Sequence, residues 1–320
     1  MRLANVVLAL MVSPLAALPA AAQGSYPDRP VRIIVPYPPG GATDILARQV
    51  GEKLTTVLGT NVVVENRAGA SGVIGFDYVA KAEPDGYTLL MGTANMTIVR
   101  AFGKAPFDPE KDFAPVSTLV SSQNLLTVRP SLPVKSVKEL IEHARKNPGK
   151  LNYGSSGIGT PLMTIESLKA MTGIDMVNVP YKGDAPAIVD LLGGQIDMYA
   201  STVTGLIAHV KSGKLRALGV TGSKRALSLP DVPTIAEAGV PGYELTSWYG
   251  ILAPGGTPAA IVTKLNKALV EIVAMPEIQK KMIEGGSDPS SSTPEEFQRI
   301  ISRDVAKYTK LVKDFSLKAD

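Results

Sequence analysis

Short apolar runs alternate with amphipathic stretches through the first third of the chain. The run at 31–35 reads VRIIV, and residues 45–58 then place apolar side chains at the spacing of one helix face. Two further strand-like runs, 61–65 and 87–91, flank a second amphipathic stretch at 73–79. Repeated strand, loop and helix units of this kind predict a parallel sheet with helices on its faces. The loops after the strands must then emerge at one edge of that sheet, its carboxyl edge.

Two long extended segments interrupt this rhythm. Residues 113–128 are too long and too apolar for a loop, and they predict a strand that leaves a first domain and enters a second, with a hinge near Asn124. Residues 242–254 form another such segment, which can return the chain. The sequence therefore predicts an α/β protein with two domains joined by two crossing strands. Domain 1 is expected at 26–124 plus 249–320, and domain 2 at 125–248.

The alternation of strands and helices resumes between the crossing segments. Ser136 and Glu139 form a capping box for a helix at 137–146, and a Thr160 cap followed by Pro161 predicts another helix start. The remaining elements of this half are expected as strands at 150–154, 176–180, 195–200 and 215–220 and helices at 185–192 and 205–211. Helices at 258–275, 276–284 and 293–317 complete the first domain. The second domain thus copies the first in plan.

The N-terminus has the three-part pattern of a secretory signal peptide. Arg2 precedes an apolar stretch at 3–18, and a small-residue cleavage site ends near Ala22. The apolar stretch is too short for a comfortable membrane span. The chain has no cysteine, which excludes disulfides, thiolate metal sites and a lipid-modified cysteine at the cleavage site. We therefore expect an exported, soluble protein cleaved near Ala22.

Charge adds little to this picture. The formal net charge is +4, lysines and arginines are scattered, and aromatic residues make up 5% of the chain. A nucleic-acid surface needs clustered basic residues with aromatic residues between them, so no nucleic-acid partner is expected. A mild positive excess would help to attract small anions.

The first loop, at 36–44, combines three prolines with Gly40 and Gly41. The prolines stiffen the exit from the strand, the glycines allow a sharp turn, and Thr43 or Asp44 can cap the following helix. This geometry aims backbone N–H groups and a helix N-terminus at the space above the strand end. The loop therefore suits an anion, although taken alone it could also be an ordinary connection.

Loops of similar composition follow the other strands, and crossing strands would bring the carboxyl edges of the two sheets face to face. Gly, Ser, Thr and Asn dominate these loops, where Arg67 and Lys182 are the expected fixed positive charges. Many donors with little fixed charge suit a small carboxylate held by helix N-termini. The expected ligand-binding residues are Tyr37, Gly40, Gly41, Thr43, Asp44, Thr93, Ala94, Asn95, Ser155, Ser156, Gly157, Gly159, Thr160, Lys182, Gly183, Asp184, Ser201 and Thr202.

The sequence offers little catalytic machinery. His143 and His209 are both expected inside helices, away from the loops after the strands. Ser155 and Ser156 lack the Gly-x-Ser-x-Gly spacing of a nucleophile elbow, and no nucleotide-binding glycine motif follows a strand. No residue pattern indicates a metal site. We expect no catalytic residue, cofactor or metal; the alternative is an exported hydrolase that uses Ser155 or Ser156.

Six motifs occur in order along the chain: VPYPPGGATD at 35–44, VENR at 64–67, YGSSG at 153–157, VPYKG at 179–183, DLLGGQID at 190–197 and LPDVPT at 229–234. Together they resemble the Bug family, the extracytoplasmic solute-binding receptors of tripartite tricarboxylate transporters. The resemblance implies a two-domain periplasmic-binding-protein fold (Venus flytrap, type II), periplasmic localisation and delivery of a carboxylate to membrane permease subunits. It also implies that loops 36–44 and 155–160 hold one ligand carboxylate, partly through ordered waters.

Two departures from the family pattern bear on the ligand. Many relatives carry a histidine shortly after the Gly-Thr of the second-domain loop, where this chain reads PLM at 161–163. Many also carry an acid after the strand matching 196–198, where this chain reads YAS at 199–201. A buried ammonium group would then lack a partner, so a dicarboxylate, a tricarboxylate, or an aromatic or hydroxy acid is favoured over an amino acid. The receptor is expected to be a monomer, and it could serve transport or ligand sensing in signalling.

Overall fold

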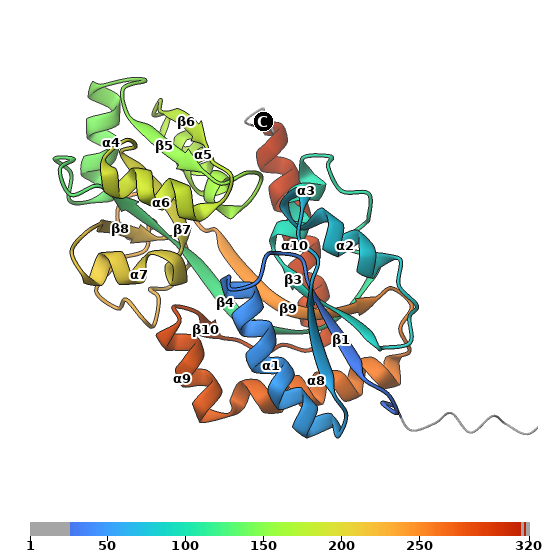
Figure 1. Ribbon diagram of the computed structural model, residues 1–320. Coiled ribbons are helices and arrows are strands. Elements are labelled where there is room, and N and C mark those ends of the chain that lie inside the picture. The colour runs from blue at the N-terminus through green and yellow to red at the C-terminus, as the bar shows by residue number, and fades with distance from the viewer. Residues whose placement is uncertain (1–25, 315–316, 318–320) are drawn as a thin grey trace, which may run out of the picture.

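The structure is a computed structural model that describes residues 26–314 and Leu317. The expected signal peptide at 1–22 lies outside these residues. The chain forms two lobes, each a sheet with helices on both faces, and two strands run from one lobe toward the other (Figure 1). The strand order along the whole sheet is β2-β1-β3-β9-β4-β7-β5-β6, with β8 and β10 pairing additionally with β4. The predicted α/β architecture is confirmed.

The first lobe is built on a parallel core of β1, β2 and β3, in which Ile33 of β1 lies opposite Val64 and Leu89. Strand β9 extends this core as an antiparallel neighbour of β3. The elements of this lobe are β1 (Val31–Val35), α1 (Ala42–Leu58), β2 (Val62–Asn66), α2 (Val73–Ala80), β3 (Thr88–Thr93), α3 (Asn95–Ala101), β9 (Thr246–Pro254), α8 (Ala259–Ala274), α9 (Pro276–Glu284), β10 (Asp288–Pro289) and α10 (Pro294–Asp314). A short 3-10 turn at Ala70–Gly72 precedes α2.

The second lobe repeats this plan with β5 as the central parallel strand, flanked by β6 and β7. Strand β8 pairs with β4 in the antiparallel direction. The elements are α4 (Val137–Lys146), β5 (Asn152–Ser155), α5 (Thr160–Thr172), β6 (Val177–Pro180), α6 (Asp184–Gly193), β7 (Met198–Thr202), α7 (Val203–Lys211) and β8 (Arg216–Val220). The expected similarity in plan between the two halves is therefore present in the sheets.

Strand β4 (Phe113–Val128) belongs to both lobes. Its residues up to Gln123 pair with β9, and from Asn124 onward they pair with β7 and β8. The predicted extended segment at 113–128 is confirmed with the same bounds. Strand β4 therefore connects the two sheets by its own backbone, and its hydrogen-bond partners change from β9 in the first lobe to β7 and β8 in the second.

Alternating side chains of the sheets supply four apolar clusters, one on each face of each lobe. In the first lobe Ile33 packs under α1 and α8, whereas Ile34 packs with Phe76 and Phe297 on the side of α2 and α10. In the second lobe Leu126 faces α4 and α5, and Leu125 faces α6 and α7. Period-2 alternation thus decides which helix each strand residue contacts.

Helix α10 reaches across both lobes (Figure 1). Phe297 and Ile301 pack in the first lobe, whereas Tyr308 lies in an apolar cluster of the second lobe with Tyr243. Lys307 Nζ donates to the Glu244 carbonyl at 2.5 Å. Between residues 26 and 314, neither this helix nor any other is long and apolar enough to cross a membrane.

Some local sequence signals predicted the ends of helices and strands correctly, and others did not. Gly59 closes α1 in the left-handed conformation, and Ser136 accepts a hydrogen bond from the Glu139 N–H, as predicted. Helix α3 was missed, because the stretch after β3 was interpreted as a loop, and β7 begins at Met198, three residues later than predicted. Neither feature has a local stop or start signal; both depend on contacts with distant strands.

Close packing at Gly250 gives a test of the fold. A Cβ atom there would lie 2.6 Å from the buried Phe297 ring and 2.8 Å from the Ser117 carbonyl. We expect Gly250→Ala to lower the free energy of unfolding by about 1–3 kcal/mol, because the strand and ring must shift. Urea unfolding followed by circular dichroism measures this change.

Gly193→Ala is the matched control, because a Cβ atom at Gly193 would meet nothing within 4 Å and the residue is helical. The control should unfold like the wild type or slightly later. Equal stability of the two variants would contradict the packing described for Gly250.

Candidate ligand site

The loop after β1 places a helix N-terminus beside the carboxyl edge of the first sheet. Gly40 has φ +86°, which favours glycine, and Gly41 is the N-cap of α1 in an extended conformation. The expected capping by Thr43 or Asp44 is wrong, because α1 already begins at Ala42. Asp44 instead lies in the first turn, and its Oδ2 accepts the Gly40 N–H at 3.0 Å. The carboxylate thereby closes the loop back onto the helix.

Asp44 is committed to this internal network. Its side chain is buried, with the residue 3% exposed, and it accepts hydrogen bonds from Arg48 Nε at 3.0 Å and Asn66 Nδ2 at 2.9 Å. Burial alone would raise the pKa of the carboxyl, but the hydrogen bonds from Arg48, Gly40 and Asn66 outweigh burial and lower the pKa to about 2. Asp44 therefore holds the loop as a carboxylate, with its oxygens already occupied.

Tyr37, Thr93 and Thr43 gather around a tyrosine of the crossing strand. The Tyr37 hydroxyl lies 2.9 Å from Thr93 Oγ1, and burial raises the pKa of Tyr37 to about 12. Tyr249 of β9 interacts with Thr43. It also lies close enough to Tyr37 and to Asp184 of the second lobe for both to raise its pKa. Burial chiefly raises the pKa of Tyr249, so this phenol stays neutral and can donate a hydrogen bond.

The second lobe contributes an acid whose oxygens are also occupied. Asp184, in the first turn of α6, accepts Tyr199 OH at 2.7 Å and Ser201 Oγ at 2.6 Å. Ser156 also interacts with Tyr199, and burial followed by the nearby Asp184 charge raises the pKa of this phenol. The fold thus brings together loops that follow β5, β6 and β7.

Loops of the two lobes meet directly. A Cβ atom at Gly157 would lie 3.4 Å from Ser71 Oγ, and one at Gly159 would lie 3.2 Å from Asn95 Oδ1. Gly159 is the N-cap of α5, so the expected Thr160 cap is wrong; the extended backbone of Gly159 starts this helix without a side-chain cap. Glycines at these positions let the second lobe approach the first closely.

Asn95 and Thr160 provide further polar groups at this junction. Asn95 Nδ2 donates to the Ser71 carbonyl at 2.7 Å, which fixes the amide orientation, and its buried Oδ1 has no hydrogen-bond partner. Thr160 Oγ1 lies 3.5 Å from Asn124 Oδ1 on β4, where the strand changes partner. The contact between lobes therefore extends to the crossing strand itself.

Other predicted residues take less central places. Thr93, Ala94, Ser155 and Ser201 are buried at the strand ends, whereas Lys182 and Gly183 are exposed. Lys182 makes no hydrogen bond or ion pair within the described part of the chain. Beyond Thr202, Gly286 of the first lobe covers the start of α7, since a Cβ atom there would lie 2.8 Å from Thr204 N.

Arg67 does not supply positive charge to the site, contrary to the prediction. It was expected to supply positive charge to the site, but its guanidinium stacks on Tyr78 at 3.6 Å and pairs with Glu65 at 2.7 Å. Both partners lie on elements of the first lobe beside α2. Helix N-termini, backbone N–H groups and Lys182 are therefore the sources of positive potential at the facing loops.

Three residues near the facing loops were not predicted from the sequence: Tyr249, Tyr199 and Ser71. Tyr249 and Tyr199 lie within strands, so a search of the loops after strands passes over them. Ser71 lies in the glycine-rich loop that was expected to line the site. Its backbone adopts the left-handed conformation, with φ 56°, and this unusual conformation cannot be read from the sequence.

The chemistry of the assembled groups is that of binding. Hydroxyl, amide and backbone groups dominate, and the two acids, Asp44 and Asp184, already accept donors from their own lobes. His143 and His209 lie within α4 and α7, away from Ser155 and Ser156. Among residues 26–314, no cluster of three or more His, Asp or Glu side chains could hold a metal ion.

A two-lobed α/β fold with donor-rich loops meeting between the lobes defines the periplasmic solute-binding receptors. The chain belongs to the family described as tripartite tricarboxylate transporter family receptor, which it matches over residues 46–317. This confirms the resemblance inferred from the six motifs.

Individual relatives agree with this assignment. Protein BugT of Bordetella pertussis is 35% identical over 298 residues, which are 92% of this chain and 91% of BugT. The structure of R. palustris Rpa4515 with adipate is 38% identical, with a TM-score of 0.83, and the match covers 92% of this chain and 99% of that one. MatC (Rpa3494) of Rhodopseudomonas palustris with bound malate is 30% identical, with a TM-score of 0.79, covering 90% and 100%.

The lowered pKa of Asp44 makes stability depend on pH. Its stabilising effect is present above the unfolded pKa of about 4 and is lost as pH falls toward about 2. We expect Asp44→Asn to cost about 2 kcal/mol at pH 7, and this difference from the wild type should shrink between pH 4 and pH 2. Urea unfolding at a series of pH values measures it; a difference independent of pH would contradict the ionised network.

Proposed function

We propose that this protein captures a small carboxylate between the two lobes and delivers it to the membrane subunits of a tripartite tricarboxylate transporter. The observation that carries the proposal is the meeting of Gly157 and Gly159 with Ser71 and Asn95, because it brings polar loops of both lobes to one place. The proposed site comprises the eighteen residues predicted from sequence, to which we add Tyr249, Tyr199 and Ser71; within it the carboxylates of Asp44 and Asp184 hold the loops, and the other residues face the ligand.

The chemistry of the facing loops favours an anion without an ammonium group. The N-termini of α1 and α5 begin at Gly41 and Gly159 without side-chain caps, which leaves their N–H groups for an anion. Adipate in Rpa4515 and malate in MatC support a dicarboxylate, with or without a hydroxyl group, as the ligand here.

Binding would couple to hinge motion. We propose domain boundaries near 124/125 and 248/249, close to the change of β4 pairing after Gln123 and to the start of β9 at Thr246. A ligand that touches both lobes gains affinity only when they close on it, so it shifts the balance toward the closed form.

The remaining parts of the proposal concern setting and partners. We propose export through a signal peptide at 1–22, a monomeric receptor, permease subunits as partners and no catalysis; membership of the receptor family supports the role in transport. The alternative is a hydrolase, which would need a histidine as the base for its serine. The loop that carries Ser155 and Ser156 has no histidine. A fluorophosphonate probe that labels the purified protein would favour the hydrolase.

Thermal-shift measurements with adipate, malate, succinate and citrate on the mature chain test the proposal. A ligand at 100 times its dissociation constant should add about 2.7 kcal/mol to the free energy of unfolding. Glucose, which has no carboxylate, and lysine, whose net charge is positive, serve as controls and should not raise the melting temperature. Failure of every organic acid to stabilise the protein would overturn the proposed function.

Gly41→Leu tests the opening loop. The backbone of Gly41 is extended, and a Cβ atom there would come no closer than 3.9 Å to other groups, so the fold should tolerate the change. The larger side chain should block approach to the N-terminus of α1 and weaken binding at least about a hundredfold, since the anion loses its N–H donors. Calorimetric titration with the best ligand measures this, and Gly193→Leu at the exposed end of α6 is the control.

A further inference from the structure

A groove of about 770 Å³ lies on the first lobe beside α2. The starts of β1 and β3 form one wall, and side chains of α2 from Ile74 to Lys81 form the other. Its lining includes four basic side chains, Arg29, Arg32, Arg67 and Lys81, and three acidic ones, Asp77, Glu83 and Asp85. The groove therefore carries charges of both signs, and Glu65, which pairs with Arg67, lies beside its lining residues.

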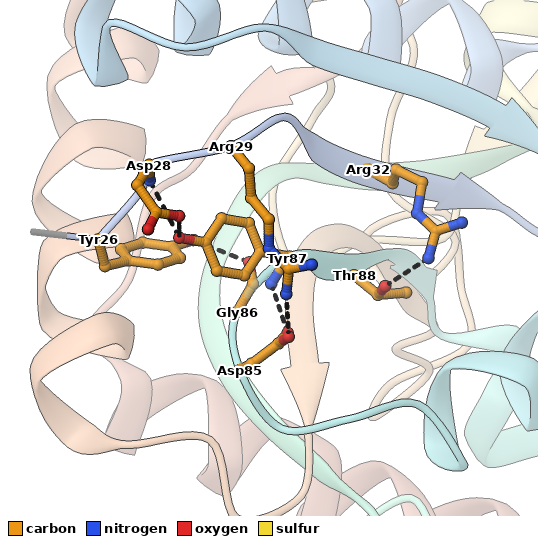
Figure 2. Close-up of polar contacts among 8 residues, drawn as sticks. All are labelled: Tyr26, Asp28, Arg29, Arg32, Asp85, Gly86, Tyr87 and Thr88. Atoms are coloured by element: carbon orange, nitrogen blue, oxygen red, sulfur yellow. Dashed lines mark hydrogen bonds and ion pairs between the residues drawn. The ribbon is translucent and has the colours of Figure 1, made fainter. Parts of the chain in front are cut away.

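Two arginine-on-tyrosine stacks flank this groove. Arg29 lies over the Tyr87 ring at 4.2 Å and pairs with Asp85 at 2.7 Å, as Figure 2 shows. Arg67 stacks on Tyr78 in the same way on the side of α2. Each contact holds a guanidinium over its tyrosine ring, so attraction to the ring adds to the ion pair of the same arginine.

Arg32 belongs to the β1 wall of the groove, and it differs from the other basic side chains of the lining. Its Nη2 donates to Thr88 Oγ1 at 3.2 Å, the contact drawn for it in Figure 2. Arg29, Arg67 and Lys81 each have a carboxylate partner, at 2.7 Å in every case, whereas Arg32 has none among residues 26–314. A guanidinium fork matches a carboxylate in geometry as well as in charge.

The groove is independent of the ligand site. Arg32 and Thr88 lie near the amino ends of β1 and β3, while Tyr37 and Thr93 lie at the carboxyl ends of the same strands. Every lining residue belongs to the first lobe, so hinge motion leaves the groove unchanged. A partner bound here could hold the receptor while the second lobe moves.

We propose that this groove docks an acidic peptide segment of a partner protein, with Arg32 binding an aspartate or glutamate side chain of that segment. The groove is too large and open for one small anion to be enclosed, whereas a peptide would also cover the tyrosine faces and Ile74, which is 54% exposed. Aromatic and arginine side chains are the groups enriched at protein interfaces.

A fluorescein-labelled hexaglutamate peptide is the probe, titrated into the mature protein at low salt and followed by fluorescence anisotropy. We expect binding that weakens with added salt, and Arg32→Glu should weaken it at least about tenfold because attraction becomes repulsion. Arg32→Gln should fall between the two. Adipate binding and thermal stability of Arg32→Glu should match those of the wild type, since Arg32 lies outside the ligand site.

Lys267→Glu is the matched control, because Lys267 is exposed on α8 over the opposite face of the sheet and the change alters net charge by the same amount. It should keep peptide affinity within about twofold of the wild type. Equal losses in both variants, no loss in Arg32→Glu, or no peptide binding by the wild type would overturn the proposal. None of these outcomes bears on carboxylate binding between the lobes, which the adipate titration measures separately.

Discussion

The hydrogen-bond ladder of β4 is the constraint on which the rest of the structure depends. A strand of 16 residues has enough length for one half to pair in the first sheet and the other half in the second. Its backbone groups are satisfied on both sides of the partner change at Gln123 and Asn124. Gln123 and Asn124 at this point are themselves hydrogen-bonded, Gln123 to Gly222 and Asp288 and Asn124 to Thr164 and Thr221, which keeps the two sheets in a defined relation.

The same geometry decides where binding chemistry can occur. Parallel strands in each lobe direct their following loops to the carboxyl edge, and β4 turns these edges toward one another. Glycines at the meeting points remove the side chains that would hold the loops apart, as at Gly157 and Gly159. Specific side chains then complete the junction from both lobes, with Tyr249 on the crossing strand near Asp184 across from it.

Electrostatics in this site relies on arrangement more than on formal charge. Both acids near the loops already accept donors of their own lobe: Asp44 accepts Arg48 and Asn66, and Asp184 accepts the hydroxyl groups of Tyr199 and Ser201. The free donors that remain are uncapped helix N-termini, whose partial positive charge is fixed in direction. Positive charge without a carboxylate partner is also found at Lys182, which is exposed after β6, and at Arg32, in a groove that the site does not share.

The sequence by itself determined the element types, the two crossing segments and the family, because hydrophobic period and the six motifs are local properties of the chain. The predicted strand at 113–128 and helix at 276–284 match the structure residue for residue. Tertiary structure alone decided that Gly41 and Gly159 are the helix N-caps, that Asp44 binds within its own lobe, and that Arg67 leaves the site for Tyr78. Asp44 and Arg67 depend on which of several nearby side chains the folded backbone brings to them, such as Asn66 for Asp44 and Tyr78 for Arg67, and no local pattern specifies that choice.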